Sequence, residues 1–115
     1  MTILGEQGLL LSPPIWVDFM DLRGRLIGLD EPGTQRDLER WGIDLHEGMR
    51  IVCYSWDGTD QLESDDLIAV VTVLDNLGAT GLVGSVEWGE ATHFSELSLP
   101  ERAAYSRFRP HADLG

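Results

Sequence analysis

Alternation of apolar and polar positions predicts five β-strands along the chain. β-branched and aromatic residues dominate these runs, and a period of two puts one set of side chains on each face of a sheet. The first two runs are expected to form a hairpin through Gly24, and the last two to form a second hairpin. The third is apolar on both faces, which is typical of a central strand. In chain order, the runs cover residues 15–20, 25–29, 50–56, 67–74 and 82–88.

Two other segments follow a helical pattern. A helix over about 34–41 is predicted by Thr34 and Asp37, which have the spacing of a capping box, and Gly42 is expected to end it. A C-terminal helix over about 99–108 is predicted by Ser98 and Glu101, which have the same spacing. The helices are short, so we expect them to cover parts of the sheet.

These elements indicate one small domain. A chain of 115 residues can bury enough surface for a single core without a metal or a disulfide. The expected fold is mainly β (α+β), a small antiparallel, partly open barrel of about five strands with one short helix and a C-terminal helix. We place the domain at 14–109, after a loosely ordered N-terminal lead (1–13) and before a tail (110–115).

Parts of the chain resemble a eukaryotic-type SH3 domain, namely Tyr54, Asp65-Asp66-Leu67 and Gly81-Leu-Val-Gly-Ser. In that family, an acidic loop and an aromatic groove bind proline-rich peptides. The tandem tryptophan and the central hairpin of the family are absent here, and Gly84 replaces the proline of its final motif. The resemblance therefore implies an SH3-like barrel, and it does not extend to peptide binding.

The run from Gly33 to Met49 resembles a segment of small uncharacterised acidic bacterial single-domain proteins. That resemblance implies a bacterial or phage-like origin and assigns no functional residue. A further run, Gly78-Ala-Thr-Gly81-Leu-Val-Gly84, resembles the glycine-rich turn of NAD(P)-binding Rossmann proteins. In those proteins a helix must follow the glycines, whereas here a strand pattern follows. The run therefore predicts a hairpin turn and no cofactor.

Charge is strongly one-signed. The chain has 20 acidic residues, eight arginines and no lysine, for a formal net charge of −12. Residues 51–101 hold ten acidic residues and no basic residue, whereas 102–115 hold one acidic residue and three arginines. Such a chain lacks the basic footprint that binds phosphate backbones, so we expect no direct nucleic-acid binding.

Several site chemistries are excluded by single residues. Cys53 is the only cysteine, so neither an internal disulfide nor a zinc site with several thiolates can form. An EF-hand that began at Asp57 would need a glycine where Leu62 stands, so the sequence predicts no metal site of that kind. There is no apolar run long enough for a membrane span and no signal-peptide pattern, which favours a cytoplasmic protein that does not bind membranes.

The charge distribution favours a non-enzymatic acidic interaction module that binds a basic protein partner. Immunity proteins, toxin inhibitors and anti-defence proteins act in this way, and some of them mimic DNA. A one-signed surface attracts such a partner electrostatically, and tryptophans beside it would serve as hot spots. The residues expected to bind the partner are Trp56, Asp57, Asp60, Glu63, Asp65, Asp66, Glu87, Trp88 and Glu90.

Two alternatives remain open from the sequence. One is a small ligand-binding or hydrolytic barrel in which Glu87, Glu90 and His93 converge in a pocket. The other is an accessory domain that works as a homodimer by burying an edge strand. No catalytic residue is singled out, because no known catalytic motif occurs in the chain.

Overall fold

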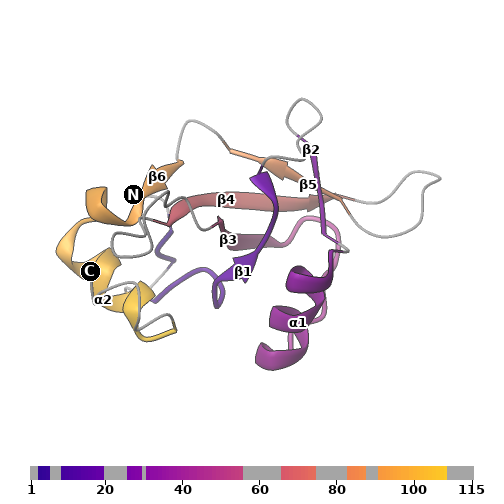
Figure 1. The fold of residues 1–115 in the computed structure, drawn as a ribbon, viewed down its shortest axis with the longest axis horizontal. Helices are drawn as coiled ribbons and strands as arrows, with labels where there is room; N and C mark the ends of the chain where they lie inside the picture. The colour runs from indigo at the N-terminus through magenta and orange to yellow at the C-terminus, as the bar shows by residue number, and fades with distance from the viewer. Residues whose placement is uncertain are drawn as a thin grey trace.

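The structure is a computed structural model that describes residues 3–5, 9–19, 26–29, 31–55, 66–74, 83–87 and 91–108. Its sheet has the order β1-β3-β4-β5-β2, and β6 pairs with β4 beside that path (Figure 1). The elements are β1 (Ile15–Trp16), β2 (Leu26–Gly28), α1 (Pro32–Trp41), β3 (Arg50–Ser55), β4 (Leu67–Leu74), β5 (Val83–Val86), β6 (Thr92–His93), the 3-10 turn η4 (Phe94–Glu96) and α2 (Leu99–Ser106).

The fold class expected from the sequence is confirmed. The sheet is curled into a half-barrel and carries two helices, which makes a small, mainly-β α+β fold. Figure 1 shows α1 beside β1 and β2, and α2 at the other end of the sheet, near β6. The sheet is mixed rather than wholly antiparallel, because β1 runs parallel to β3.

The two predicted hairpins have different outcomes. The second is confirmed, because β4 and β5 are antiparallel neighbours, with Val73 opposite Gly84. The first is wrong: β1 pairs with β3, and β2 pairs antiparallel with β5 at the far side of the sheet. The physical reason is that alternation tells which face a residue occupies but not which strand lies beside it. Pairing with β3 sets Ile15 beside Cys53, and both are fully buried.

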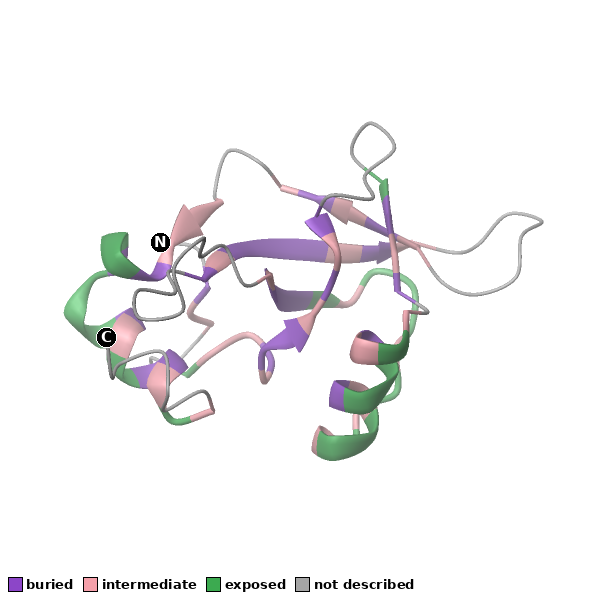
Figure 2. Ribbon diagram, viewed as in Figure 1, coloured by how far each residue is buried: buried purple, intermediate pink, exposed green. Residues whose placement is uncertain are grey.

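Strands β3 and β4 form the centre of the sheet, and Figure 2 shows most of their length as buried. Side chains on one face of β3 and β4 belong to the first core. This core contains Ile51, Cys53 and Val71, together with residues of β1, β2 and β5. The opposite face carries a second core that includes the side chains Val52, Tyr54, Ile68, Val70 and Tyr105. This explains why the strand patterns are apolar at nearly every position.

The N-terminal lead contributes to the second core. The sequence predicts a loosely ordered segment there, whereas Ile3 is fully buried and Leu4 packs against the same cluster. The Ser12 hydroxyl accepts a hydrogen bond from the backbone N–H of Val52 at 2.9 Å. The described part of the lead is therefore attached to the sheet through apolar contacts and a hydrogen bond.

Helix α1 starts two residues before the predicted position. Pro32 stands in its first turn, where a fixed φ favours helix, and Glu31 is the N-cap without a side-chain cap. Thr34 and Asp37 are therefore not a capping box, and both side chains point to strand β1 instead. The predicted end is confirmed, because Gly42 adopts the left-handed conformation at φ 65°.

Helix α2 begins as the sequence predicts. The Ser98 hydroxyl accepts from the Glu101 N–H, and the Glu101 carboxylate accepts from the Ser98 N–H, which completes the capping box. Tyr105 then enters the second core from this helix. Phe108, just beyond α2, packs edge-on against Trp41 with ring centroids 5.2 Å apart, so the chain after α2 contacts the end of α1.

Candidate functional site at the junction of β1 and α1

Only two of the residues expected to bind a partner lie within the described parts of the chain. These are Asp66 and Glu87. The other members of the predicted set lie outside the described residues: Trp56, Asp57, Asp60, Glu63, Asp65, Trp88 and Glu90. Most of them belong to the connection between β3 and β4. The strand ends that flank this connection are described, and Ser55 at the end of β3 pairs with Leu67 at the start of β4.

Asp66 lies inside the molecule, with 1% of its surface exposed. Its Oδ2 accepts a hydrogen bond of 2.6 Å from the Tyr105 hydroxyl, and its backbone carbonyl accepts from the Phe94 N–H at 2.9 Å. The Asp66 carboxylate therefore ties the start of β4 to α2, and its backbone carbonyl ties it to η4. A buried group cannot meet a partner surface, so we leave Asp66 out of the acidic surface.

Glu87 is partly exposed and already binds an arginine. Arg50 Nε and Nη2 each donate a hydrogen bond of 3.2 Å to one of the two Glu87 carboxylate oxygens. The Thr72 hydroxyl donates a third, also of 3.2 Å, to Oε2. Two parallel N–H···O bonds make this a fork-to-fork pair. Arg50 thus offsets the charge of Glu87 at the edge between β3, β4 and β5.

Glu87, Glu90 and His93 are the residues expected to converge in a ligand-binding or hydrolytic pocket. The two that the structure describes, Glu87 and His93, do not lie together. Glu87 binds Thr72, whereas His93 pairs with Leu67 on the same strand and contacts Glu96 through its Nδ1 at 3.1 Å. Thr72 and Leu67 are five positions apart, which is about 16 Å along a strand. Glu90 lies outside the described residues.

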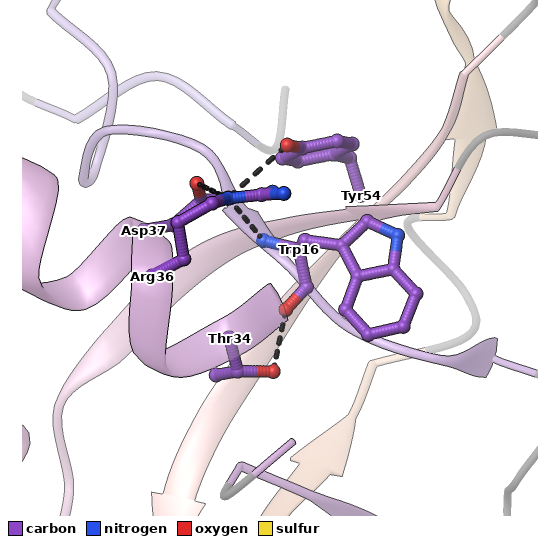
Figure 3. Close-up of polar contacts among 5 residues, drawn as sticks. All are labelled: Trp16, Thr34, Arg36, Asp37 and Tyr54. Atoms are coloured by element: carbon purple, nitrogen blue, oxygen red, sulfur yellow. Dashed lines mark hydrogen bonds and ion pairs between the residues drawn. The ribbon is translucent and has the colours of Figure 1, made fainter. Parts of the chain in front are cut away.

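A cluster that the sequence did not single out lies between β1 and α1, centred on Asp37 (Figure 3). Asp37 is only 2% exposed, and its Oδ2 accepts from the Trp16 backbone N–H at 2.9 Å and from the Tyr54 hydroxyl at 3.1 Å. Its Oδ1 accepts from Arg36 Nε at 3.1 Å. The hydrogen bond to Asp37 and the charge of Asp37 raise the pKa of Arg36 above its usual value. Three donors thus compensate a carboxylate that is removed from water.

The same cluster closes the outer edge of β1. Strand β1 pairs with β3 on one side, where the Val17 N–H donates to the Tyr54 carbonyl at 3.0 Å. On the other side, the Trp16 N–H meets Asp37, and the Trp16 carbonyl accepts from the Thr34 hydroxyl at 2.7 Å. Side chains of α1 therefore take the place of a neighbouring strand for both polar groups of Trp16.

The Trp16 side chain points away from this hydrogen-bond cluster (Figure 3) and lines a cavity of about 340 Å³. The other lining residues are Glu31, Pro32, Gly33 and Arg36, all at the start of α1. Gly33 is required here by close packing, because a Cβ at this position would lie 2.6 Å from the Trp16 ring. The cavity thus has an aromatic wall, a carboxylate and a guanidinium.

The sequence contains a signal that could have identified this cluster. Asp37 follows Thr34 by three positions and precedes Trp41 by four, so the three share one helical face. An acidic residue on the face that a short helix turns to a sheet needs hydrogen-bond donors there. The same spacing also fits a capping box, in which Asp37 would bind a backbone N–H of its own helix.

The described residues contain neither a metal-binding cluster nor a membrane-spanning helix. Among the described residues, no group of three or more histidine, cysteine or acidic side chains could hold a metal ion. None of the described helices is both long and apolar enough to cross a membrane. Comparisons with protein-family models, curated proteins and solved structures found no match for this chain.

Proposed function

We propose that the protein is a non-enzymatic acidic module that docks onto a basic protein surface, as immunity proteins, toxin inhibitors and anti-defence proteins do. The observation that carries the proposal is the charge of the connection between β3 and β4. Residues 57–65 include four acidic residues and no basic residue, and the pair Ser55–Leu67 holds the two ends of this connection side by side. The sequence therefore places four acidic residues in the short connection between β3 and β4.

Electrostatic complementarity of this kind acts mainly on the association rate and on the choice of partner. A concentrated negative field attracts a basic surface over a distance that salt shortens, to about 10 Å at 0.1 M ionic strength. The proposal therefore requires that association is fast at low salt and slows as salt is added. Residues 51–101 contain no arginine that could pair with these carboxylates in place of the partner.

The test compares two variants that remove the same charge from different places. The first changes the connection: Asp57→Asn, Asp60→Asn and Asp65→Asn. The matched control changes three exposed acidic residues in and just after α1: Glu39→Gln, Asp44→Asn and Glu47→Gln. The probes are a panel of small basic proteins, together with any basic protein encoded next to the gene, and association rates are measured at several salt concentrations.

We expect at least one basic protein to bind with a rate that falls steeply with salt. The variant in the connection should lose at least tenfold in association rate, and the control variant should lose clearly less, because steering depends on where the charge lies. The proposal fails if no basic protein binds better than neutral proteins do, or if both variants lose rate equally. Competition by duplex DNA for the bound partner would assign the interaction to DNA mimicry.

A further inference from the structure

We propose that the cavity between Trp16 and the start of α1 receives an arginine side chain of the basic partner. This inference rests on the proposed function and names a contact for it. The cavity is lined by Trp16, Glu31, Pro32, Gly33 and Arg36, and its volume of about 340 Å³ is sufficient for a single side chain. Ligand pockets in proteins begin at about 300 Å³.

The aromatic wall is fixed in place before any partner arrives. The backbone N–H and carbonyl of Trp16 are both held by α1, through Asp37 and Thr34. Gly33 packs closely against the indole ring, so the ring has little freedom on that side. A rigid tryptophan loses little conformational entropy on binding, which is why this residue type is frequent in interface hot spots.

The charges of the cavity favour a cation as its occupant. Arg36 is 62% exposed, but its Nε is bound to the Asp37 carboxylate, which offsets its charge. The Glu31 carboxylate forms neither a hydrogen bond nor an ion pair with any part of the chain that the structure describes. It also offsets the partial positive charge of the helix N-terminus. A positive occupant would therefore complete an ion pair with Glu31 at the rim of the cavity.

Arginine fits this arrangement better than lysine does. Its planar guanidinium can stack on an indole face while it donates two parallel hydrogen bonds to a carboxylate. The protein contains two arginine–aromatic contacts of its own, since Cζ of Arg40 lies 4.7 Å from the centre of the Trp41 ring and Cζ of Arg102 lies 5.2 Å from that of the Phe94 ring. A compact ammonium group would gain the ion pair and lose the stacking geometry.

The test follows the indole N–H signal of Trp16 by NMR in the intact protein, with Trp16→Phe used only to assign the signal. The probes are four capped tripeptides, Gly-Arg-Gly, Gly-Lys-Gly, Gly-Glu-Gly and Gly-Gly-Gly, and inorganic phosphate. The Arg peptide should shift the Trp16 signal in a saturable way in the millimolar range, with the Lys peptide weaker. The three other probes should leave the signal unchanged.

Two substitutions locate the contact, one at the N-cap of α1 and one within the helix. Glu31→Gln should weaken binding of the Arg peptide about fivefold, as expected for loss of one exposed ion pair. Glu39→Gln, on the same helix but outside the cavity, removes the same charge and should change the affinity less than twofold. Equal effects of the two variants would overturn the inference, because they would reduce it to the general negative field of the protein.

Other results would overturn the inference directly. A shift of the Trp16 signal by phosphate or by the Glu peptide would assign the cavity to an anion held by Arg36 and the helix N-terminus. Absence of a shift with every probe would show that the cavity has no such occupant. These outcomes are separable from the proposed function, whose readout is association with a whole basic protein. That association could persist without the Trp16 contact, and the peptide contact could persist without a protein partner.

Discussion

Gly84 on β5 has a packing role that its sequence context did not suggest. It faces Val73 on β4 and Ile27 on β2, and a Cβ at this position would lie 2.2 Å from Cγ1 of Val71. Its backbone conformation is ordinary for a strand. The requirement for glycine is therefore one of space, at the point where the sheet curls over its own core.

We predict that Gly84→Ala destabilises the protein by about 1–3 kcal/mol, because the added methyl group must displace a packed side chain. Val71→Ala should restore part of this loss, since it removes the atom that the new methyl group meets. Urea denaturation of both single variants and the double variant would give a coupling energy of about 1 kcal/mol or more. Ser85→Ala on the same strand is the control and should cost about 0.5 kcal/mol or less. Additive effects would contradict the close approach.

Cys53 gives a prediction for alkaline pH. It is fully buried in β3, and burial raises the pKa of its thiol far above the usual value, because the thiolate would be desolvated. The unfolded chain therefore loses this proton at about pH 8.5, while the folded protein retains it. The contribution of Cys53 to stability is complete below that pH and is lost as the pH rises.

We expect the free energy of unfolding to fall by about 1.4 kcal/mol per pH unit above about pH 9 through this residue alone. The measurement is urea denaturation of the wild type and of Cys53→Ala at intervals between about pH 7 and pH 10.5, where the two curves should converge as the pH rises. Parallel curves would contradict the prediction, because they would show that the thiol ionises over the same pH range in the folded protein and in the unfolded chain.

At the scale of elements, the junction of β1 and α1 depends on two side chains. Thr34 and Asp37 satisfy the outward-facing carbonyl and N–H of Trp16. This two-residue strand therefore keeps its backbone hydrogen bonds, although no strand among the described residues lies on that side. A buried backbone group that loses its only partner costs about 1–3 kcal/mol. The hydrogen bonds from α1 should therefore contribute measurably to stability.

We predict that Thr34→Val, which keeps the shape and removes the donor, lowers the free energy of unfolding by about 1–2 kcal/mol. Asp37→Ala should cost more, about 2–4 kcal/mol, because it removes the acceptor for the Trp16 N–H and the Tyr54 hydroxyl together. Gln35→Ala, an exposed position between them, is the control and should have an effect within about 0.5 kcal/mol. Chemical denaturation measures all three. Equal effects of Thr34→Val and Gln35→Ala would show that the hydrogen bond from the Thr34 hydroxyl to Trp16 does not contribute to stability.

The elements themselves could largely be predicted from the sequence. The run 67–74 coincides with β4, and β3, β5 and both helices lie within two residues of their predicted bounds, because alternation, Gly42 and the Ser98 capping box are local signals. Strand partners could not be predicted in the same way. The pairing of β1 with β3 joins residues 38 positions apart, and nothing local in Ile15–Trp16 specifies that neighbour.

The candidate site was missed for a related reason. The three-residue spacing of Thr34 and Asp37 fits a capping box and fits equally a pair of side chains on one helical face. The position of β1 decides between the two, because Thr34 and Asp37 bind the backbone of Trp16 in that strand. Asp66 shows the reverse case, since its place in an acidic run indicated an exposed residue, whereas Tyr105, 39 positions later, provides it with a buried partner.

At the scale of the whole molecule, net charge should influence stability as well as binding. A charge of −12 on 115 residues creates repulsion that is stronger in the compact state than in the unfolded chain. We expect the melting temperature to rise by several degrees as NaCl increases from about 0.02 M to about 0.5 M, because salt screens this repulsion. Differential scanning calorimetry measures the change. A melting temperature that falls or stays constant would show that ion pairs such as Arg50–Glu87 dominate the balance.

The closure of the β1 edge by α1 has a consequence for the behaviour of the protein at high concentration. A sheet edge with free N–H and carbonyl groups can recruit a strand from another chain and so start aggregation. Here the groups of Trp16 are occupied by side chains of the same molecule, and self-association along that edge would first require α1 to detach. The helix therefore also protects solubility, and partial unfolding that releases it would convert the end of the sheet into a template for other copies of the chain.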